Sequence, residues 1–379
     1  MHIPPFATEQ FFARYEFNTP HLLCASDCES MSVEELLEMA GDSYDQLGAV
    51  QLAYTESQGL PALREQVAGL YDQVDADGVV MLGAPEEGIF LLMHTLLEAG
   101  DEVVVLTPAY DSLRHLVAHV AGADKVRNWS LQATEDGWEL DMDRLESLLT
   151  PQTKLLVVNF PHNPTGYLPD QETLRAIVGL CRQHDIWLFC DEMYRGLELD
   201  GRETLPSAAD LYEKAIVLSG LSKTHGLPGL RCGWLLMSDP ALRERLINWK
   251  HYTTICAPAP IEFLAGVALT VESELSQRNR QIVAANLALA EPFFQRHRDF
   301  FSWRRPQAGS VALVEVAVES ADAYCRQLAE EAGVLLLPGT CLGAPANTVR
   351  FGFGRRSFGE GLAAYEVYLE GGGTPRSLV

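Results

Sequence analysis

The chain has 379 residues, 47% of them apolar, which is enough to bury the core of one large domain and a smaller one. Its 28 basic and 52 acidic residues give a net charge of −24 without any basic run, so neither nucleic acid nor an anionic membrane is an expected partner. The eight cysteines form no cluster with metal-ligand spacing, and no apolar run reaches membrane-spanning length. We expect a globular, cytoplasmic protein that holds no metal.

Aromatic and acidic side chains dominate the N-terminal stretch, which we interpret as an arm (residues 1–45) that joins the small domain. A helix-like pattern comes first, and an irregular stretch follows it. Ser32 precedes Glu35 by three residues, and this capping-box spacing predicts the start of another helix. The sequence leaves open what the acids of the arm do, namely Glu16, Asp27 and Glu29.

A strand, a tight turn and a helix are predicted from Val79 onward. Gly83 and Ala84 allow a sharp turn, and Pro85 suits the first helical position because its missing N–H needs no partner there. The free N–H groups of the first helical turn, at Glu86, can hold a phosphate. Such junctions are common in α/β proteins, so this one alone is weak evidence.

Two further predicted strands end in residues that suit a ligand site. The strand at 102–106 leads to Tyr110, an aromatic residue that can stack on a planar ring or cap the core. The strand at 154–159 leads into Asn163-Pro-Thr-Gly166, which on composition alone is a rigid turn. In open α/β sheets the carboxyl ends of the strands are the edge where ligands bind, so we expect these residues to meet there.

The strand at 186–190 ends in Asp191, followed three residues later by Tyr194. A carboxylate at a buried strand end costs several kcal/mol unless a cation or good hydrogen bonds accompany it. A protonated pyridine nitrogen is one such cation, and the carboxylate would keep that ring able to accept electrons.

The strand at 215–219 breaks into small residues and presents Lys223. Arg231, eight residues further on, adds a second cation, so an anionic ligand is indicated. A lysine amine can form a Schiff base with a carbonyl ligand once desolvation or a nearby cation lowers its pKa. The chain contains neither a G-x-G-x-x-G motif after a first strand nor a P-loop motif, which removes the main support for nicotinamide enzymes and P-loop nucleotidases.

The C-terminal part predicts a small α+β domain. A long amphipathic helix is expected over 261–298, strands over 311–318 and 334–337, and a helix over 321–332. We place the large domain at residues 46–270 and the small domain at residues 271–379.

Taken together, these motifs resemble the class I/II aminotransferases, which are fold-type-I enzymes dependent on pyridoxal 5'-phosphate (PLP). The resemblance covers about residues 50–355. It implies an α/β large domain with a mostly parallel sheet between helices, a small α+β domain, PLP held by Lys223 as a Schiff base, and a homodimer with shared active sites. It further implies that an L-amino acid and a 2-oxo acid are the substrates.

Several residue roles come from this resemblance. Catalysis is assigned to Lys223, Asp191 and Tyr194. Tyr110 would stack on the cofactor ring and Asn163 would donate to its phenolic oxygen, while Arg350, with Asn163 nearby, would bind the substrate α-carboxylate. The cofactor phosphate would be held by Gly83, Ala84, Pro85, Glu86, Ser219, Ser222, Arg231 and, from the other subunit, Tyr54.

The chain departs from the family pattern at two places. Gly220 stands where many members have a phosphate-binding serine, and Ala25-Ser-Asp-Cys-Glu29 replaces a Gly-x-Pro loop beside the substrate. If an arm acid faces the pocket, it favours a cationic substrate side chain, whereas all of these acids can equally be solvated.

Other functions share the same anchor residues. Residues 159–166 and 227–234 are also similar to capreomycidine-synthase-like members, so a C–S lyase or a cyclase is an alternative. A PLP-sensing regulator is a remote one, because the aminotransferase pattern starts within the first ~50 residues and leaves no room for a DNA-binding domain.

Overall fold

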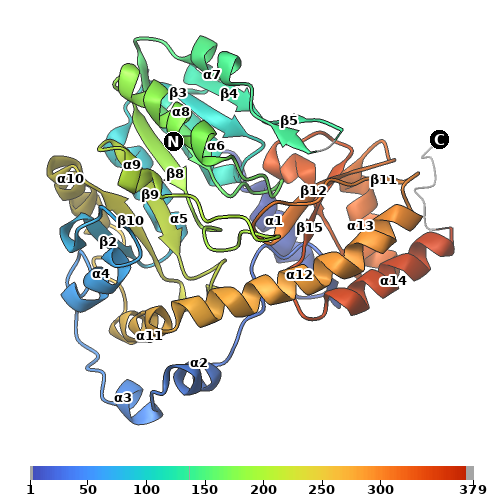
Figure 1. The fold of residues 1–379 in the computed structure, drawn as a ribbon, viewed down its shortest axis with the longest axis horizontal. Helices are drawn as coiled ribbons and strands as arrows, with labels where there is room; N and C mark the ends of the chain where they lie inside the picture. The colour runs from blue at the N-terminus through green and yellow to red at the C-terminus, as the bar shows by residue number, and fades with distance from the viewer. Residues whose placement is uncertain (1–2, 136, 373–379) are drawn as a thin grey trace.

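A computed structural model describes residues 3–135 and 137–372 of the chain (Figure 1). Its centre is a seven-stranded sheet with the order β2-β10-β9-β8-β7-β3-β4. Of these strands only β10 runs antiparallel to its neighbours, so the predicted mostly parallel sheet is confirmed. The strands are β2 (Val79–Leu82), β3 (Glu102–Thr107), β4 (Val126–Ser130), β7 (Thr153–Asn159), β8 (Trp187–Asp191), β9 (Ala215–Gly220) and β10 (Gly233–Met237).

Apolar side chains alternate between the two faces of this sheet and build a core on each. In β2, Val79 and Met81 join one cluster, whereas Val80 and Leu82 join the other. One face is covered by α5 (Pro85–Leu96), α6 (Asp111–Ala121) and α10 (Pro240–Lys250). The opposite face is covered by α2 (Val33–Ala40), α4 (Pro61–Ala68), α7 (Met142–Leu148), α8 (Gln171–Gln183), α9 (Ala208–Leu211) and α11 (Ala259–Thr270).

The C-terminal part builds the expected small α+β unit, whose antiparallel sheet has the strand order β11-β12-β15-β14. Figure 1 shows α12 running from α11, beside the large sheet, to the helices and strands of this small unit. Its elements are α12 (Glu272–Arg296), β11 (Phe301–Ser302), β12 (Val311–Val316), α13 (Ala321–Ala332), β13 (Val334–Leu335), β14 (Leu337–Pro338), β15 (Thr348–Gly352) and α14 (Phe358–Glu370).

The N-terminal arm contacts the small unit directly. Strand β1 (His21–Leu22) pairs in parallel with β13, and α1 (Ala7–Tyr15) packs near residues 337–342. Ser32 and Glu35 form the predicted capping box at the start of α2.

The domain boundaries at 45/46 and 270/271 stay predictions, and residues 373–379 of the predicted small domain lie outside the described residues. The remaining elements are α3 (Tyr44–Gly48), β5 (Gln132–Ala133), β6 (Trp138–Glu139) and the 3-10 turns Ala76–Gly78, Ala123–Lys125, Pro228–Leu230 and Gly339–Leu342.

Two predicted elements were wrong in their continuity. The helix expected over 261–298 is divided into α11 and α12 at Val271, whose φ of −123° and ψ of 29° lie outside the helical range. The strand expected over 334–337 is divided at Leu336, because β13 pairs with β1 while β14 pairs with β15 in the other sheet.

In the part of the chain that the structure describes, no helix is both long and apolar enough to cross a membrane.

Candidate active site

The predicted ligand residues do meet at the carboxyl edge of the large sheet. Asn159 and Asp191 are paired residues at the ends of β7 and β8, and Lys223 follows three residues after β9. Asn159 fixes the next turn by accepting a 2.7 Å hydrogen bond from the backbone N–H of Asn163, and its own side-chain amide donates to the Asp191 carbonyl at 2.7 Å. The parallel register therefore places all three loops side by side.

Asp191 occupies a desolvated position at the end of β8. Burial raises the pKa of its carboxyl to about 6, although the backbone N–H of Met193 and the charge of Lys223 act in the opposite direction. Its Oδ1 accepts from the Met193 N–H at 3.1 Å, and no ion pair to it is formed within the described ranges. Such a carboxylate is suited to form an ion pair with a cationic group of a ligand.

Lys223 is held by the N-terminal arm. Its Nζ donates to the Ser26 hydroxyl at 2.7 Å. Burial lowers the pKa of Lys223, and the charge of Arg350 lowers it further, whereas Asp27, Asp191 and Glu9 raise it. A lysine in this environment is available as a nucleophile closer to neutral pH than a solvated one.

Arg350 lies in β15 of the small unit, is only 1% exposed, and reaches the large sheet. Its guanidinium donates to Asn163 Oδ1 at 3.3 Å and to the Cys24 carbonyl at 3.0 Å. The Arg350 Nε is buried without a partner among the described residues. The guanidinium therefore retains a free donor beside Asn163, which is the feature that carboxylate binding requires.

Tyr194 and Tyr110 are both anchored by arm residues. The Tyr194 hydroxyl donates to the Ser26 carbonyl at 2.9 Å. The Tyr110 hydroxyl donates to Glu9 Oε1 at 2.8 Å, and its ring contacts Phe6 at a centroid distance of 5.1 Å. Glu9 has no place in the sequence-based interpretation, although it shares one helical face with Glu16.

The predicted phosphate turn precedes α5, whose first residue is Pro85. The Gly83 N–H already donates to Glu87 Oε2 at 2.8 Å. Burial raises the pKa of Glu86 to about 7, while a hydrogen bond from Ser112 and the charge of Arg231 lower it. The charge of Arg231 thus acts at this turn, although its side chain is exposed and donates to the Pro228 carbonyl at 3.0 Å.

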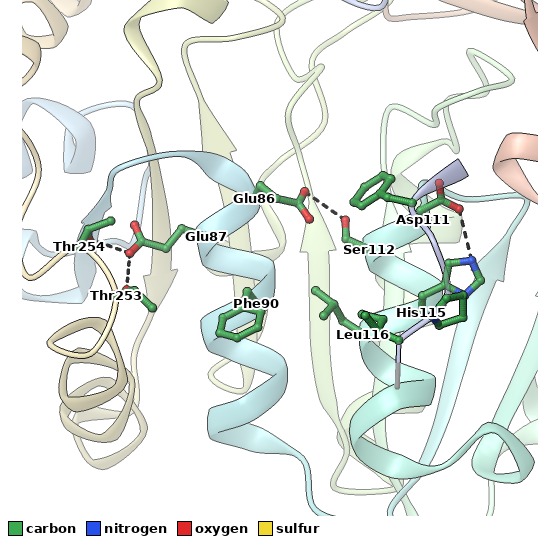
Figure 2. A pocket seen from close by; sticks show the side chains of 12 residues that line it. Glu86, Glu87, Phe90, Asp111, Ser112, His115, Leu116, Thr253 and Thr254 are labelled. Atoms are coloured by element: carbon green, nitrogen blue, oxygen red, sulfur yellow. Dashed lines mark hydrogen bonds and ion pairs between the residues drawn. The ribbon is translucent and has the colours of Figure 1, made fainter. Parts of the chain in front are cut away.

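Figure 2 shows the groove beside this turn, a cavity of about 410 Å³ between α5 and α6. Glu86 points to Ser112, whereas Glu87 points away from it to Thr253 and Thr254. The groove is lined on one side by residues of α6 and on the other by Thr253 and Thr254.

Gly220 explains one departure from the family pattern. A Cβ at this position would lie 2.8 Å from the Cys232 carbonyl oxygen and 3.2 Å from Cγ of Pro85. The backbone of Cys232 and Gly233, at the start of the neighbouring strand β10, therefore leaves no room for a serine, and Pro85 adds to the crowding. Of the two serines expected to replace it, Ser219 faces the Tyr71 hydroxyl, whereas the buried Ser222 hydroxyl has no partner among the described residues.

The arm acids divide into two groups. Asp27 forms an ion pair with Arg355, and Glu29 accepts from the backbone N–H of Arg356 at 2.8 Å. Burial raises the pKa of Glu16, and the charges of Asp27 and Glu9 raise it further. Glu16 therefore lies close to other carboxylates, without an ion pair inside the described part of the chain.

Tyr54 is the predicted residue that the structure does not bring to this site within one chain. Its side chain is 87% exposed, and no hydrogen bond joins it to the other candidates within the described ranges. Tyr252, in the turn that follows α10, is 83% exposed.

The desolvated Asp191, the lysine and the orphan serine together fit PLP. Asp191 lacks a cation that a protonated pyridine nitrogen supplies, Ser222 has an unused hydroxyl for the phosphate, and Lys223 is the amine for the carbonyl. No group of three metal-ligating side chains is found in the described residues.

The known proteins that resemble this chain include PLP-dependent enzymes, in agreement with the site described above. The family model for aminotransferase class I and II matches residues 22–357. The arginine–pyruvate transaminase of Pseudomonas aeruginosa is 29% identical over 325 residues, which cover 81% of this chain and 79% of that protein. The capreomycidine synthase of Streptomyces vinaceus is 31% identical over 323 residues, covering 83% and 80%. A solved PLP-dependent cyclase superposes with a TM-score of 0.91 at 29% identity, covering 98% of both chains.

Proposed function

The chain belongs to the aminotransferase class I and II family, whose cofactor is PLP, and from that premise we propose that it moves the amino group of an L-amino acid to a 2-oxo acid with Lys223 bonded to the cofactor. One observation carries the proposal. Lys223 and Asn163 come from two loops, Asp191 from the end of β8 and Arg350 from β15, and these four residues lie at one desolvated site. An amine, a half-buried carboxylate and a carboxylate-binding guanidinium are the set that this reaction needs.

When bound, PLP supplies a ring that accepts the electron pair of a bond broken at the substrate Cα. Asp191 would keep the ring nitrogen protonated. Tyr194 and Asn163 would hold the phenolic oxygen, and Tyr110 would stack on the ring. Ser222, Arg231 and the turn before α5 would hold the phosphate. The Lys223 amine would take the proton from the substrate Cα and later release it.

Arg350 orients the substrate. Because its fork is fixed by Asn163 and the Cys24 carbonyl, it binds the α-carboxylate without losing side-chain freedom on binding. This fixes which bond at Cα faces Lys223.

Borohydride reduction tests the attachment. In the purified, yellow holoprotein, reduction should fix the cofactor on Lys223, and peptide mapping identifies the modified residue. Lys223→Ala should bind PLP without a covalent bond, because Asp191 and Arg231 remain. A cofactor fixed on another lysine contradicts the proposal.

We further propose that the amino donor has a cationic side chain. Phe12 lies 6.0 Å from the Arg350 guanidinium, and Glu9 and Glu16 stand three residues before it and four after it, on the same face of α1 and its C-terminal end. A substrate held by Arg350 therefore extends its side chain toward two carboxylates that have no ion-pair partner in the described residues. The name of the arginine–pyruvate transaminase supports this class of donor.

A panel of donors measures this specificity. Arginine and lysine should convert PLP to its pyridoxamine form faster than glutamate or norleucine, as followed by absorbance. Glu16→Gln should lower kcat/KM for arginine about tenfold, a typical cost of a partly desolvated charge pair, and leave norleucine unchanged. Glu38→Gln, exposed on α2, is the matched control. Glutamate as the fastest donor contradicts the cationic class.

A cyclase or lyase on the same residues is the second candidate, favoured by the 31% identity to capreomycidine synthase and by the PLP-dependent cyclase of the same fold. Mass spectrometry separates the two. Aminotransfer needs an added 2-oxo acid for turnover and yields a new amino acid, whereas elimination or cyclisation proceeds without any oxo acid.

The functional unit we propose is a homodimer in which the partner subunit's Tyr54 binds the cofactor phosphate. The side chains of Leu52, Tyr54 and Tyr252 are 83–87% exposed, and hydrogen bonds between Thr55 and Ala257 and between Ser57 and His251 hold their two segments together. This grouping supports the dimer, because apolar side chains exposed together mark contact surfaces.

A further inference from the structure

The catalytic lysine touches a residue that the family pattern does not provide. Lys223 Nζ donates to Ser26 Oγ at 2.7 Å, and Ser26 belongs to the segment that replaces the Gly-x-Pro loop. We propose that Ser26 is a catalytic residue that holds the Lys223 amine in line with the substrate Cα and stabilises the ammonium that Lys223 becomes on taking the proton. This inference rests on the proposed function.

The arm backbone fixes Ser26 from several directions. Its carbonyl oxygen accepts from the Tyr194 hydroxyl at 2.9 Å and from the Ser310 hydroxyl at 2.8 Å. The hydroxyl of Ser26 therefore starts from a backbone that is tied both to the large sheet, through Tyr194, and to the small unit, through Ser310. Such a placement is preorganised rather than incidental.

Two glycines let the arm lie this close to the small unit. A Cβ at Gly352 would overlap the Ala25 carbonyl, and a Cβ at Gly354 would overlap the Asp27 carbonyl. Backbone hydrogen bonds of 2.8 Å flank the contact, from Gly352 to Leu23 and from Glu29 to Gly354. The segment that carries Ser26 is thus tied at both ends to the backbone at and just after the end of β15.

The proton step balances as follows. The lone pair of the Lys223 amine takes the Cα proton as H⁺, and the electron pair of the C–H bond stays with the substrate and the cofactor ring. The resulting ammonium has three N–H donors, and Ser26 Oγ accepts one of them, which favours the charged form. When Lys223 returns the proton, the amine keeps its orientation because the hydroxyl still accepts.

Other charged groups face the amine from every side, and they set the background against which Ser26 acts. Asp191 lies at the end of β8, Asp27 in the arm, Glu9 in α1, and Arg350 in β15. Glu16 also acts on Lys223 through its charge. Substituting Ser26 changes none of these charges, so the change in Lys223 isolates the hydroxyl.

The first measurement uses the full-length protein freed of cofactor. Only the neutral amine attacks the PLP aldehyde, so the rate of covalent binding rises with pH through the pKa of Lys223. Ser26→Ala should move this rise to lower pH by about one unit, the effect of one hydrogen bond to a charged group. Ser26→Thr, which keeps the hydroxyl, should restore the wild-type profile. Ser30→Ala is the matched control, since this exposed serine contributes only a backbone contact.

The second measurement uses the holoenzyme and a donor deuterated at Cα. Ser26→Ala should release deuterium to water about tenfold more slowly while KM for the donor changes less than about twofold, because substrate binding rests on Arg350. A Ser26→Ala protein with the wild-type pH profile and exchange rate overturns the inference, as does an equal loss in Ser26→Thr, which would assign the effect to packing. If the wild-type protein binds PLP on another residue, the proposed function itself falls.

Discussion

At the scale of single residues, burial acts on Asp191 and Lys223 in opposite directions. It raises the pKa of the carboxyl to about 6 and lowers that of the amine, so each group is less charged than it would be in water. A protonated nitrogen of the PLP ring would favour the charged form of the Asp191 carboxyl, because the two opposite charges attract. We expect Asp191→Asn to fold normally but to lose on the order of a hundredfold in kcat, as when one preorganised electrostatic partner is removed. Circular dichroism together with steady-state rates checks this, and near-normal turnover contradicts it.

Glu192, the neighbour of Asp191, gives a prediction about stability. Burial raises its pKa to about 7 from an ordinary 4.5, although Arg195 and the hydrogen bonds from Ala208 and Ser207 lower it. The folded state therefore binds this proton more tightly than the unfolded state, so the free energy of unfolding falls as pH rises from about 4.5 to about 7.

Glu192→Gln removes this titration and keeps a hydrogen-bond acceptor. Relative to wild type, the variant should gain stability as pH rises through that window, as measured by urea unfolding at several pH values. Glu203→Gln, at an exposed position, should show no such trend. A constant difference between Glu192→Gln and wild type rules out the account.

At the scale of elements, the close pairing of β10 with β9, together with Pro85 of α5, decides which phosphate ligands are possible. Restoring the family residue with Gly220→Ser would press the new side chain against the Cys232 carbonyl and Pro85. We expect a loss of about 1–3 kcal/mol in unfolding free energy, the usual cost of overpacking. Gly229→Ser is the control, because a Cβ there meets nothing within 4 Å. A stable Gly220→Ser protein that binds PLP more tightly contradicts the packing argument.

Elements with strong local signals were the predictable ones. The capping box of Ser32 and Glu35 and the helix that starts at Pro85 follow from chemistry within one turn. The division of 334–337 between two sheets does not, because it depends on pairing with β1, more than 300 residues earlier in the chain. The helix break at Val271 was missed for a different reason, because the apolar pattern continues through it.

The site residues that could be predicted are those that belong to a recognisable sequence motif. Asp191, Asn163 and Lys223 follow strand ends that the sequence marks, and the parallel register brings them together. The contacts of Ser26 with Lys223 and of Glu9 with Tyr110 were not predictable, since both join an arm without a motif to residues far away in sequence. Only the helical spacing of Glu9 and Glu16 hinted that they share a face.

At the scale of the whole molecule, the shared-site dimer predicts complementation. Tyr54→Phe and Lys223→Ala homodimers should each be nearly inactive. After mixing and exchange of subunits, half of the dimers are hybrids, and one of the two sites in each hybrid has both residues, so about one quarter of wild-type activity should return. Sedimentation checks that the mixture is dimeric. A fully active monomer, or no recovery despite proven exchange, contradicts the shared site.

The contact of the arm with Gly352 and Gly354 also sets when the site can form during synthesis. Ser26 leaves the ribosome early, but β15, the strand beside it, is completed only at Gly352, which is 326 residues later (352 − 26). At roughly 5–20 residues per second, this is a wait of roughly 15–65 seconds. Asp191 and Lys223 are also made before that strand. A nascent chain can therefore form the large sheet while Ser26 is not yet fixed beside Lys223. Full assembly of the site therefore waits until the strands of the small unit have been made.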